Sequence, residues 1–256
     1  MLITISPAKT LDFDSPLKLS RHSMPALGDE AATLAAIMRK KRPAELKALM
    51  GISDKLAELN AERFRDWAKV PAEGTRQAVL AFMGDVYTGL DARSLDARDL
   101  DWAQKHLRIL SGLYGVLRPL DLIRPYRLEM GTALATPRGA NLYQYWGETP
   151  TRLLNEQAAS LRTRWLVNLA SQEYFGVVAR KQLGPAVVTP VFKDFSNGQY
   201  KVVSFFAKKA RGLMTRFIIE NRLRKPADLL DFDREGYRYA PEESSPDAPV
   251  FKRRLA

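Results

Sequence analysis

In the stretch HLRILSGLYGVLRPLDLIRPYRLEMG, residues 106 to 131, two glycines three positions apart are followed by three arginines. Glycine lets a backbone approach another molecule closely, and phosphate oxygens accept hydrogen bonds from backbone N–H groups and from arginine. We expect a helix to end at LRILS and the next four residues to turn the chain, which gives a helix-hairpin-helix-like element that contacts DNA phosphates with little regard to base sequence. The residues expected to make these contacts are Gly112, Gly115, Arg118, Arg124 and Arg127.

The same two glycines also have a purely structural interpretation. Helices commonly end at a glycine in the left-handed conformation, so the pair could be a helix cap followed by a turn. The usual hairpin of this kind is Gly-apolar-Gly, and this one contains an extra residue.

A second cationic feature is the predicted helix SFFAKKARGLMTRFIIENRL, residues 204 to 223. At about 100° per residue its cations fall within an arc of roughly 160°, and apolar residues share the opposite side. A solvated face would give the same pattern, but cations near a helix start oppose the helix dipole, and a bound phosphate would compensate for them. Gly212 inside the helix indicates close packing or close approach. The cations assigned to DNA here are Lys208, Lys209, Arg211 and Arg216.

Three polar residues could instead serve catalysis. Lys9 follows the first predicted strand, Asp85 lies in the turn GDVYTG, and Glu173 lies just past the strand in VNLASQEYF. Sites of α/β proteins gather past strand ends, so this set could act on a nucleotide or a phosphorylated substrate. Capping and solvation would explain the same residues. The chain contains no P-loop, dinucleotide fingerprint, nucleophile elbow or metalloprotease motif.

Metal chemistry has few candidate ligands in this sequence. There is no cysteine, and the two histidines, His22 and His106, stand in a polar loop and in a predicted helix. Iron sites built on thiolates or on two histidines and a carboxylate therefore lack their ligands. We expect no metal site and no cofactor, so that any effect on iron is indirect; binding of iron by carboxylates alone stays open as the alternative.

The elements that must position these residues are read from periodicity and turn signals. MLITIS is typical of a buried strand. Residues 28 to 67 are typical of helices, with breaks at Pro43 and at Gly51-Ile52-Ser53. A further helix is expected from Asp99 to Leu110, and two more from Asn141 and after Pro150. RWLVNLA, AVVTPVF, YKVVSFF, GYRYA and VFKRR are predicted strands, with a hairpin at Asn-Gly in KDFSNGQ. This order predicts an α+β fold, a single compact domain over 1–256 with a mixed β-sheet flanked by helices.

Composition favours an anionic partner. The 256 residues are 46% hydrophobic and carry 40 Lys and Arg against 29 Asp and Glu, a formal charge of +11. Residues 200–225 hold eight bases and one acid, so the positive charge is concentrated. A basic proteome would give the same total without any role in nucleic-acid binding. MLITISPAKT carries no signal-peptide pattern and no apolar run reaches 18 residues, so we expect a cytoplasmic protein without a membrane partner.

Taken together, several segments closely resemble the bacterial YaaA peroxide-stress family. They are MLITISPAKTLDF, ISDKLAELNAERF, AFMGDVYTGL, residues 106–131, YQYWG, VNLASQEYF and FFAKKARGLMTRFIIENRL, in that order, and they span essentially residues 1 to 254. The resemblance implies a cytoplasmic protein of the hydrogen-peroxide response that limits oxidative damage and free iron and binds DNA through a positive cleft and a helix-hairpin-helix element. It implies a compact α+β fold. It supplies no catalytic residue.

Overall fold

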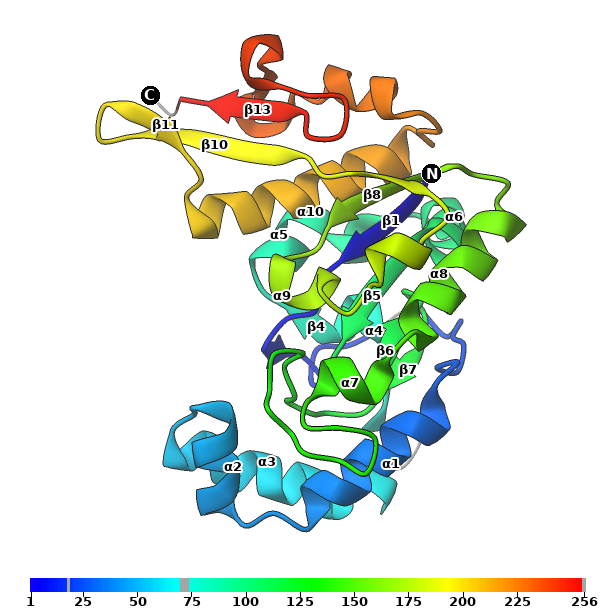
Figure 1. Ribbon diagram of the computed structural model, residues 1–256, viewed down its shortest axis with the longest axis vertical. Coiled ribbons are helices and arrows are strands. Elements are labelled where there is room, and N and C mark those ends of the chain that lie inside the picture. Colours follow the sequence, from blue (N-terminus) through cyan, green and yellow to red (C-terminus); the bar gives the residue numbers. More distant parts are fainter. Residues whose placement is uncertain (18, 70–73, 255–256) are drawn as a thin grey trace.

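The first predicted strand becomes the middle of the larger of two sheets (Figure 1). The computed structural model describes residues 1–17, 19–69 and 74–254. Strand β1 (Leu2–Ile5) lies between β5 (Leu107–Ser111) and β8 (Trp165–Leu169) and runs parallel to both. Its residues are buried on both faces, which explains why the segment is an almost unbroken apolar run.

The larger sheet has the strand order β6-β5-β1-β8-β9. β6 (Gly115–Leu117) pairs antiparallel with β5, and β9 (Ala186–Val188) pairs parallel with β8. The chain leaves β1 toward β5 on one side and leaves β8 toward β9 on the other. The carboxyl ends of β1 and β8 therefore flank the point where the winding direction reverses, which is the position at which α/β sheets bind ligands.

The smaller sheet lies against α10 and has the order β11-β10-β13-β12 (Figure 1). Its strands are β10 (Val191–Ser196), β11 (Gln199–Lys201), β12 (Arg238–Tyr239) and β13 (Val250–Arg253). Asn197 and Gly198 both have positive φ, 52° and 79°, as a two-residue hairpin turn requires. The predicted Asn-Gly hairpin is confirmed.

The helices surround the larger sheet and also form a separate group below it in Figure 1. They are α1 (Gly28–Arg39), α2 (Pro43–Met50), α3 (Asp54–Asp66), α4 (Ala78–Ala81), α5 (Asp85–Leu90), α6 (Ala97–His106), α7 (Leu142–Trp146), α8 (Thr149–Ser160), α9 (Gln172–Phe175) and α10 (Ser204–Glu220). Two short ladders add β2 (Thr10–Leu11) with β4 (Phe82–Met83), and β3 (Arg76–Gln77) with β7 (Leu122–Ile123). The α+β class, with mixed sheets flanked by helices, is confirmed.

The predicted breaks in the first helices are confirmed, and their causes are visible. Pro43 is the first residue of α2, where its missing N–H costs nothing. Gly51 ends α2 with φ 60° and ψ 44°, the left-handed cap that glycine favours. Ser53 caps α3 by accepting a hydrogen bond from the backbone N–H of Leu56.

Three predicted segments were wrong in part. The helix expected to reach Leu110 ends at His106, because the next five residues pair as β5 with β1 and β6. AVVTPVF divides into β9 and β10, which belong to different sheets, at a proline that cannot donate to a ladder. YKVVSFF is extended only to Lys201, and α10 begins at Ser204.

No helix in the described residues is both long enough and apolar enough to cross a bilayer.

Candidate functional site

A cavity of about 500 Å³ opens where β1 and β8 end. Four segments far apart in the sequence line it: the loop after β1, the start of α5, the loop after β8 with α9, and the second and third turns of α10. The polar and charged lining residues are Ser6, Lys9, Thr10, Asp85, Tyr87, Ser171, Glu173, Tyr174, Lys208 and Arg211. The cavity thus brings together the three predicted catalytic candidates and two of the cations predicted to bind DNA.

Hydrogen bonds hold the two strand-end loops at the base of the cavity together. The backbone N–H of Ser171 donates to Ser6 Oγ at 2.9 Å, and the two hydroxyl oxygens lie 3.3 Å apart. Tyr87 donates its hydroxyl to the Ser6 carbonyl at 3.1 Å, and burial raises the pKa of that phenol well above its usual value. Tyr87 is therefore a structural donor and not an acid–base group near neutral pH.

The two carboxylates of the cavity differ in how firmly they are held. Glu173 accepts a hydrogen bond from the backbone N–H of Gly131 through Oε1, at 2.9 Å, and its second oxygen stays available. Asp85 is the first residue of α5, and no side chain in the described ranges pairs with its carboxylate. Both can therefore accept hydrogen bonds from a ligand.

The three cations of the cavity differ in the same way. Lys9 forms an ion pair with Glu129, with an Nζ–Oε1 distance of 3.1 Å. Lys208 is exposed at the rim, and Arg211 is half-buried. Desolvation lowers the pKa of Arg211, and within the described ranges nothing accepts a hydrogen bond from its guanidinium. Arg211 therefore points an uncompensated positive charge into the site.

Two glycines set the position of α10 over the cavity. An added Cβ at Gly212 would lie 1.9 Å from the Val86 carbonyl oxygen, and one at Gly89 would lie 2.2 Å from the Lys209 carbonyl oxygen. Only hydrogen fits at either position, so α5 and α10 touch backbone to backbone. The prediction that Gly212 permits close packing is confirmed, and this contact fixes Arg211 relative to Asp85.

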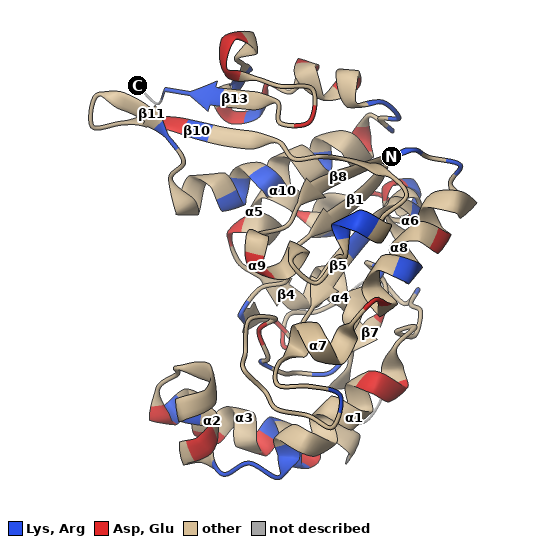
Figure 2. Ribbon diagram, in the orientation of Figure 1, with Lys and Arg blue, Asp and Glu red and all other residues tan. Residues whose placement is uncertain are grey.

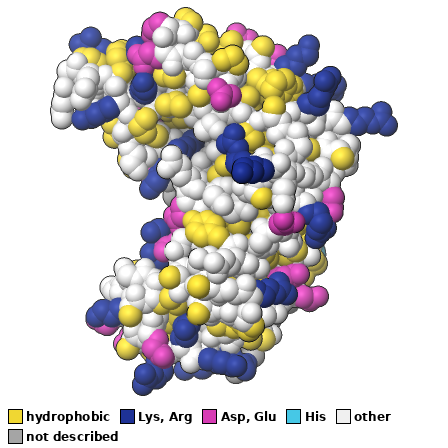
Figure 3. Space-filling view, viewed as in Figure 1, with side chains coloured by type: hydrophobic (Ala, Val, Ile, Leu, Met, Phe, Trp, Pro, Cys, Tyr) yellow, Lys and Arg dark blue, Asp and Glu magenta, His cyan; other side chains and the backbone are white. Residues whose placement is uncertain are grey.

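The cavity lies on the hollowed side of the molecule. Figure 2 shows Lys and Arg on α10 above this side and on α2 and α3 below it. The space-filling view shows a hollow between the upper part of the molecule, which carries α10, and the lower part, which carries α2 and α3, with both cationic and acidic side chains along its edge (Figure 3).

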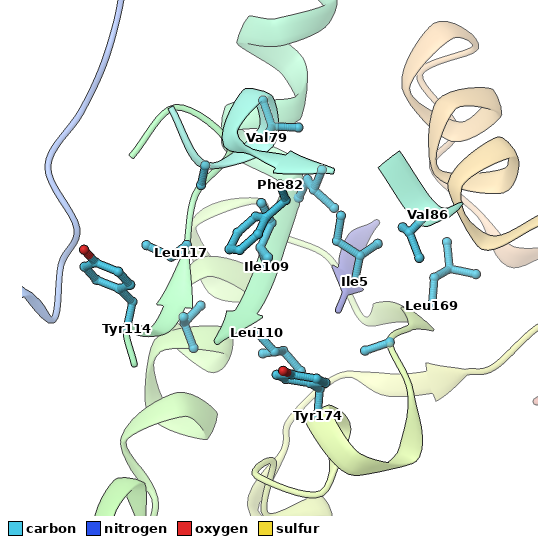
Figure 4. Packing of buried hydrophobic residues seen from close by; sticks show 14 of the residues in the cluster. Ile5, Val79, Phe82, Val86, Ile109, Leu110, Tyr114, Leu117, Leu169 and Tyr174 are labelled. Atoms are coloured by element: carbon cyan, nitrogen blue, oxygen red, sulfur yellow. The ribbon is translucent and has the colours of Figure 1, made fainter. Parts of the chain in front are cut away.

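Gly112 and Gly115 do not lie in the exposed turn after a helix that the sequence predicted. Residues 107–117 form a β-hairpin of β5 and β6, and both Gly112 and Gly115 are buried. Figure 4 shows Tyr114, from the turn between them, among the buried hydrophobic residues. The expectation of a helix-hairpin-helix-like element at this place was wrong, because LRILS is a strand and the turn faces the core. These glycines have no surface to offer a phosphate.

The arginines that follow the hairpin are bound within the protein. Arg118 pairs with the buried Asp121 at 2.9 Å, and Arg127 pairs with Glu129 at 3.0 Å. The Arg124 guanidinium lies 4.6 Å from the centre of the Trp67 ring. These contacts leave little of their charge for DNA.

Two of the α10 cations are also paired. Lys209 contacts Glu235 at 2.5 Å. Arg216 bonds Glu220 at 2.8 Å and donates to the carbonyl of Leu90 at 3.1 Å. Lys208 and Arg211 are the members of the predicted DNA-binding set for which the described residues show no partner.

A helix pair with a short turn occurs elsewhere, in α2 and α3. Gly51, Ile52 and Ser53 connect these two packed helices, and the first backbone N–H groups of α3 have no partner inside the helix. Four consecutive cations, Arg39 to Arg42, lead into α2. The sequence signals were present in the run RKKR and in the break GIS, but sequence reasoning did not connect them with DNA.

The described residues contain no group of three or more His, Asp or Glu side chains placed to hold a metal ion. His106 stacks on Trp102 with 3.9 Å between ring centroids, and its Nδ1 lies 2.8 Å from the Met1 carbonyl oxygen. Burial lowers the pKa of His106 to about 4. His22 is exposed, with Nδ1 2.9 Å from the Ser20 carbonyl oxygen.

A family model described as peroxide stress protein YaaA matches residues 1–243. The match includes every residue that lines the cavity and stops before β13.

Proposed function

The chain belongs to the peroxide stress protein YaaA family, and we propose that its part in the peroxide stress response is to bind DNA through backbone phosphates. DNA would lie in the hollow between α10 and the α2–α3 pair (Figure 3). The bound protein would cover the DNA and so reduce the damage that free iron causes to it, without binding the metal itself.

The observation that carries this proposal is the charge left over after internal pairing. The chain has a formal charge of +11, and Lys208 and Arg211 have no partner among the described residues on one side of the hollow. On the other side, the exposed Arg39 and Lys40 and the partly exposed Lys41 precede α2, while Arg42 pairs with Glu45 at 3.2 Å. Cations of this kind bind phosphates without reading bases, so the expected binding is tolerant of sequence.

Salt dependence tests the proposal directly. If about four to six phosphates are neutralised, log K should fall against log salt with a slope of roughly −3.6 to −5.4. Fluorescence anisotropy with several unrelated duplexes would measure both the slope and the sequence dependence. An affinity that hardly changes with salt, or one confined to a single short sequence, would refute phosphate binding.

A pair of charge reversals tests the location. Lys208→Glu with Arg211→Glu should abolish most of the binding, because each reversal turns a contact into repulsion. Arg98→Glu with Lys181→Glu changes the net charge equally on exposed residues outside the cavity. If both double variants lose affinity to the same extent, DNA binding depends on total charge and not on the hollow.

A second candidate function is an enzyme that acts on a nucleotide or a phosphorylated substrate in the same cleft. The gathering of Lys9, Asp85 and Glu173 in one cavity favours it. Replacing Lys9 or Glu173 with Ala should then leave DNA affinity nearly intact while raising the oxidant sensitivity of cells. Variants that protect cells as the parent does would exclude an active site built on these residues.

A further inference from the structure

Among the described residues, the guanidinium of Arg211 lacks a partner such as Lys209 and Arg216 have on the same helix. Arg216, five residues on, has a carboxylate and a carbonyl within 3.1 Å. Arg211 is half-buried, its pKa is lowered by desolvation, and the described residues offer it no acceptor. Removing a charge from water without pairing it is costly. Because Arg211 lines the cavity, a molecule that enters it can supply the missing acceptor.

The size and lining of the cavity suit a ligand larger than a simple anion. Its volume of about 500 Å³ falls within the 300–1,000 Å³ range of small-molecule sites. Asp85 and Glu173 line it together with the two free cations, and they would repel a bare phosphate. Carbon surface from Pro7, Val86 and Met83 completes the lining. A matching ligand carries an anion, hydrogen-bond donors and apolar faces.

We propose that this cavity is a nucleotide site, in which Arg211 and Lys208 bind the phosphate and Asp85 and Glu173 accept hydrogen bonds from the sugar or the base. A nucleotide combines those three properties in one molecule. The two free cations match the phosphate, since arginine can bind two of its oxygens at once. This inference deepens the second candidate function and does not require DNA binding.

Contacts within the protein hold the frame around the site. The Ser171-to-Ser6 hydrogen bond joins the loops of β1 and β8, and the backbone contact of Gly212 with Val86 fixes α10 against α5. A ligand would therefore find its contacts in place, which limits the entropy lost on binding.

Isothermal titration calorimetry with the four 2′-deoxynucleoside 5′-monophosphates and with inorganic phosphate tests the proposal. The parent protein should bind at least one nucleotide with saturation and bind inorganic phosphate more weakly. Arg211→Gln should weaken nucleotide binding about ten- to a hundredfold, since it removes a charge-assisted hydrogen bond. Arg98→Gln, a matched change at an exposed arginine outside the cavity, should leave binding unchanged.

Two further measurements separate a binding role from a structural one. Thermal unfolding of Arg211→Gln should occur at the parent temperature or higher, because the variant removes an unpaired, partly desolvated charge. Asp85→Asn should weaken binding of the nucleotide but not of inorganic phosphate. A parent protein that binds no nucleotide up to millimolar concentration would overturn the proposal, and so would an Arg211→Gln variant that binds as tightly as the parent. Equal affinity for phosphate and nucleotide would overturn the nucleotide assignment.

The nucleotide could be free or could belong to a DNA strand, and competition distinguishes the two sources. A duplex with one unpaired nucleotide that displaces the bound monophosphate, while a fully paired duplex does not, identifies a nucleotide unit turned out of DNA. Binding of the monophosphate that neither duplex disturbs identifies a free nucleotide. In that case the site stands even if the protein fails to bind DNA in the salt titration.

Discussion

Replacing Gly112 with Ala separates a structural glycine from one that touches DNA. An added Cβ would lie 2.3 Å from the Leu128 carbonyl oxygen and 3.0 Å from the Glu129 carbonyl carbon. Both neighbours are backbone, so one of the two segments must move. The carbonyl of Gly112 also accepts a buried hydrogen bond from Trp146 Nε1 at 3.0 Å, which that movement would strain.

The expected cost combines two effects. Overpacking a close contact costs about 1–3 kcal/mol, and a weakened buried hydrogen bond adds about 1 kcal/mol. A loss of about 2–4 kcal/mol corresponds to a lower Tm by roughly 5–15 °C for a chain of this size. Below the transition, the folded variant should bind DNA with the parent affinity, because the glycine is buried.

Thermal unfolding followed by circular dichroism, together with anisotropy titrations at a temperature where the variant is folded, measures both effects. Gly28→Ala is the matched control, since a Cβ at the start of α1 would meet nothing within 4 Å. It should unfold at the parent temperature or slightly above. A Gly112→Ala variant that unfolds normally and binds DNA several-fold more weakly would refute this reasoning and restore the glycine to the DNA interface.

The other predictions concern groups whose environment is set by burial. The pKa of His106 is about 4 in the folded protein and about 6.5 in the unfolded chain, so on acidification the unfolded state gains a proton first. The free energy of unfolding should therefore fall by about 1–3 kcal/mol from pH 6.5 to pH 4. In urea unfolding, His106→Gln should reduce this pH dependence, and an unchanged dependence would contradict the prediction. Asp194 accepts hydrogen bonds from Arg253 Nε at 2.7 Å and from the Tyr237 hydroxyl at 2.8 Å. Asp194→Ala should destabilise the protein by about 3–5 kcal/mol in urea unfolding, because the buried Arg253 keeps only Glu235, at 3.1 Å, and the buried Tyr237 hydroxyl loses its acceptor. Ser53→Ala should cost about 1 kcal/mol by removing the cap of α3, and faster amide exchange confined to the start of that helix would show it.

Local signals predicted those parts of the fold that local chemistry decides. Pro43 and Gly51 interrupt helices through their own backbone restrictions, and Asn197-Gly198 selects a hairpin turn by itself. LRILS was assigned to the wrong element because its conformation is chosen by partners about a hundred residues away. Ile3 opposes Leu107 in the ladder, and no pattern within residues 107–111 records that pairing.

The candidate site was predicted as scattered pieces. Lys9, Glu173 and Arg211 were each singled out, but only tertiary structure shows that they line one cavity. Whether each cation is free to bind a ligand or is already paired within the protein was harder to predict. Arg118 and its partner Asp121 are three residues apart and could have been paired on paper, whereas Lys209 meets Glu235 through the packing of a distant turn.

The position of β13 inside the smaller sheet also constrains how the protein is made. Arg253 pairs with Asp194 across 59 residues of chain, and β13 lies between β10 and β12. A nascent chain on the ribosome must therefore extend past Val250 before β10 gains its parallel neighbour. Until then the edge of β10 that will receive β13 stays open and prone to pairing with other strands. Chains truncated by a premature stop between α10 and β13 would carry the cavity but keep that open edge, so we expect them to aggregate.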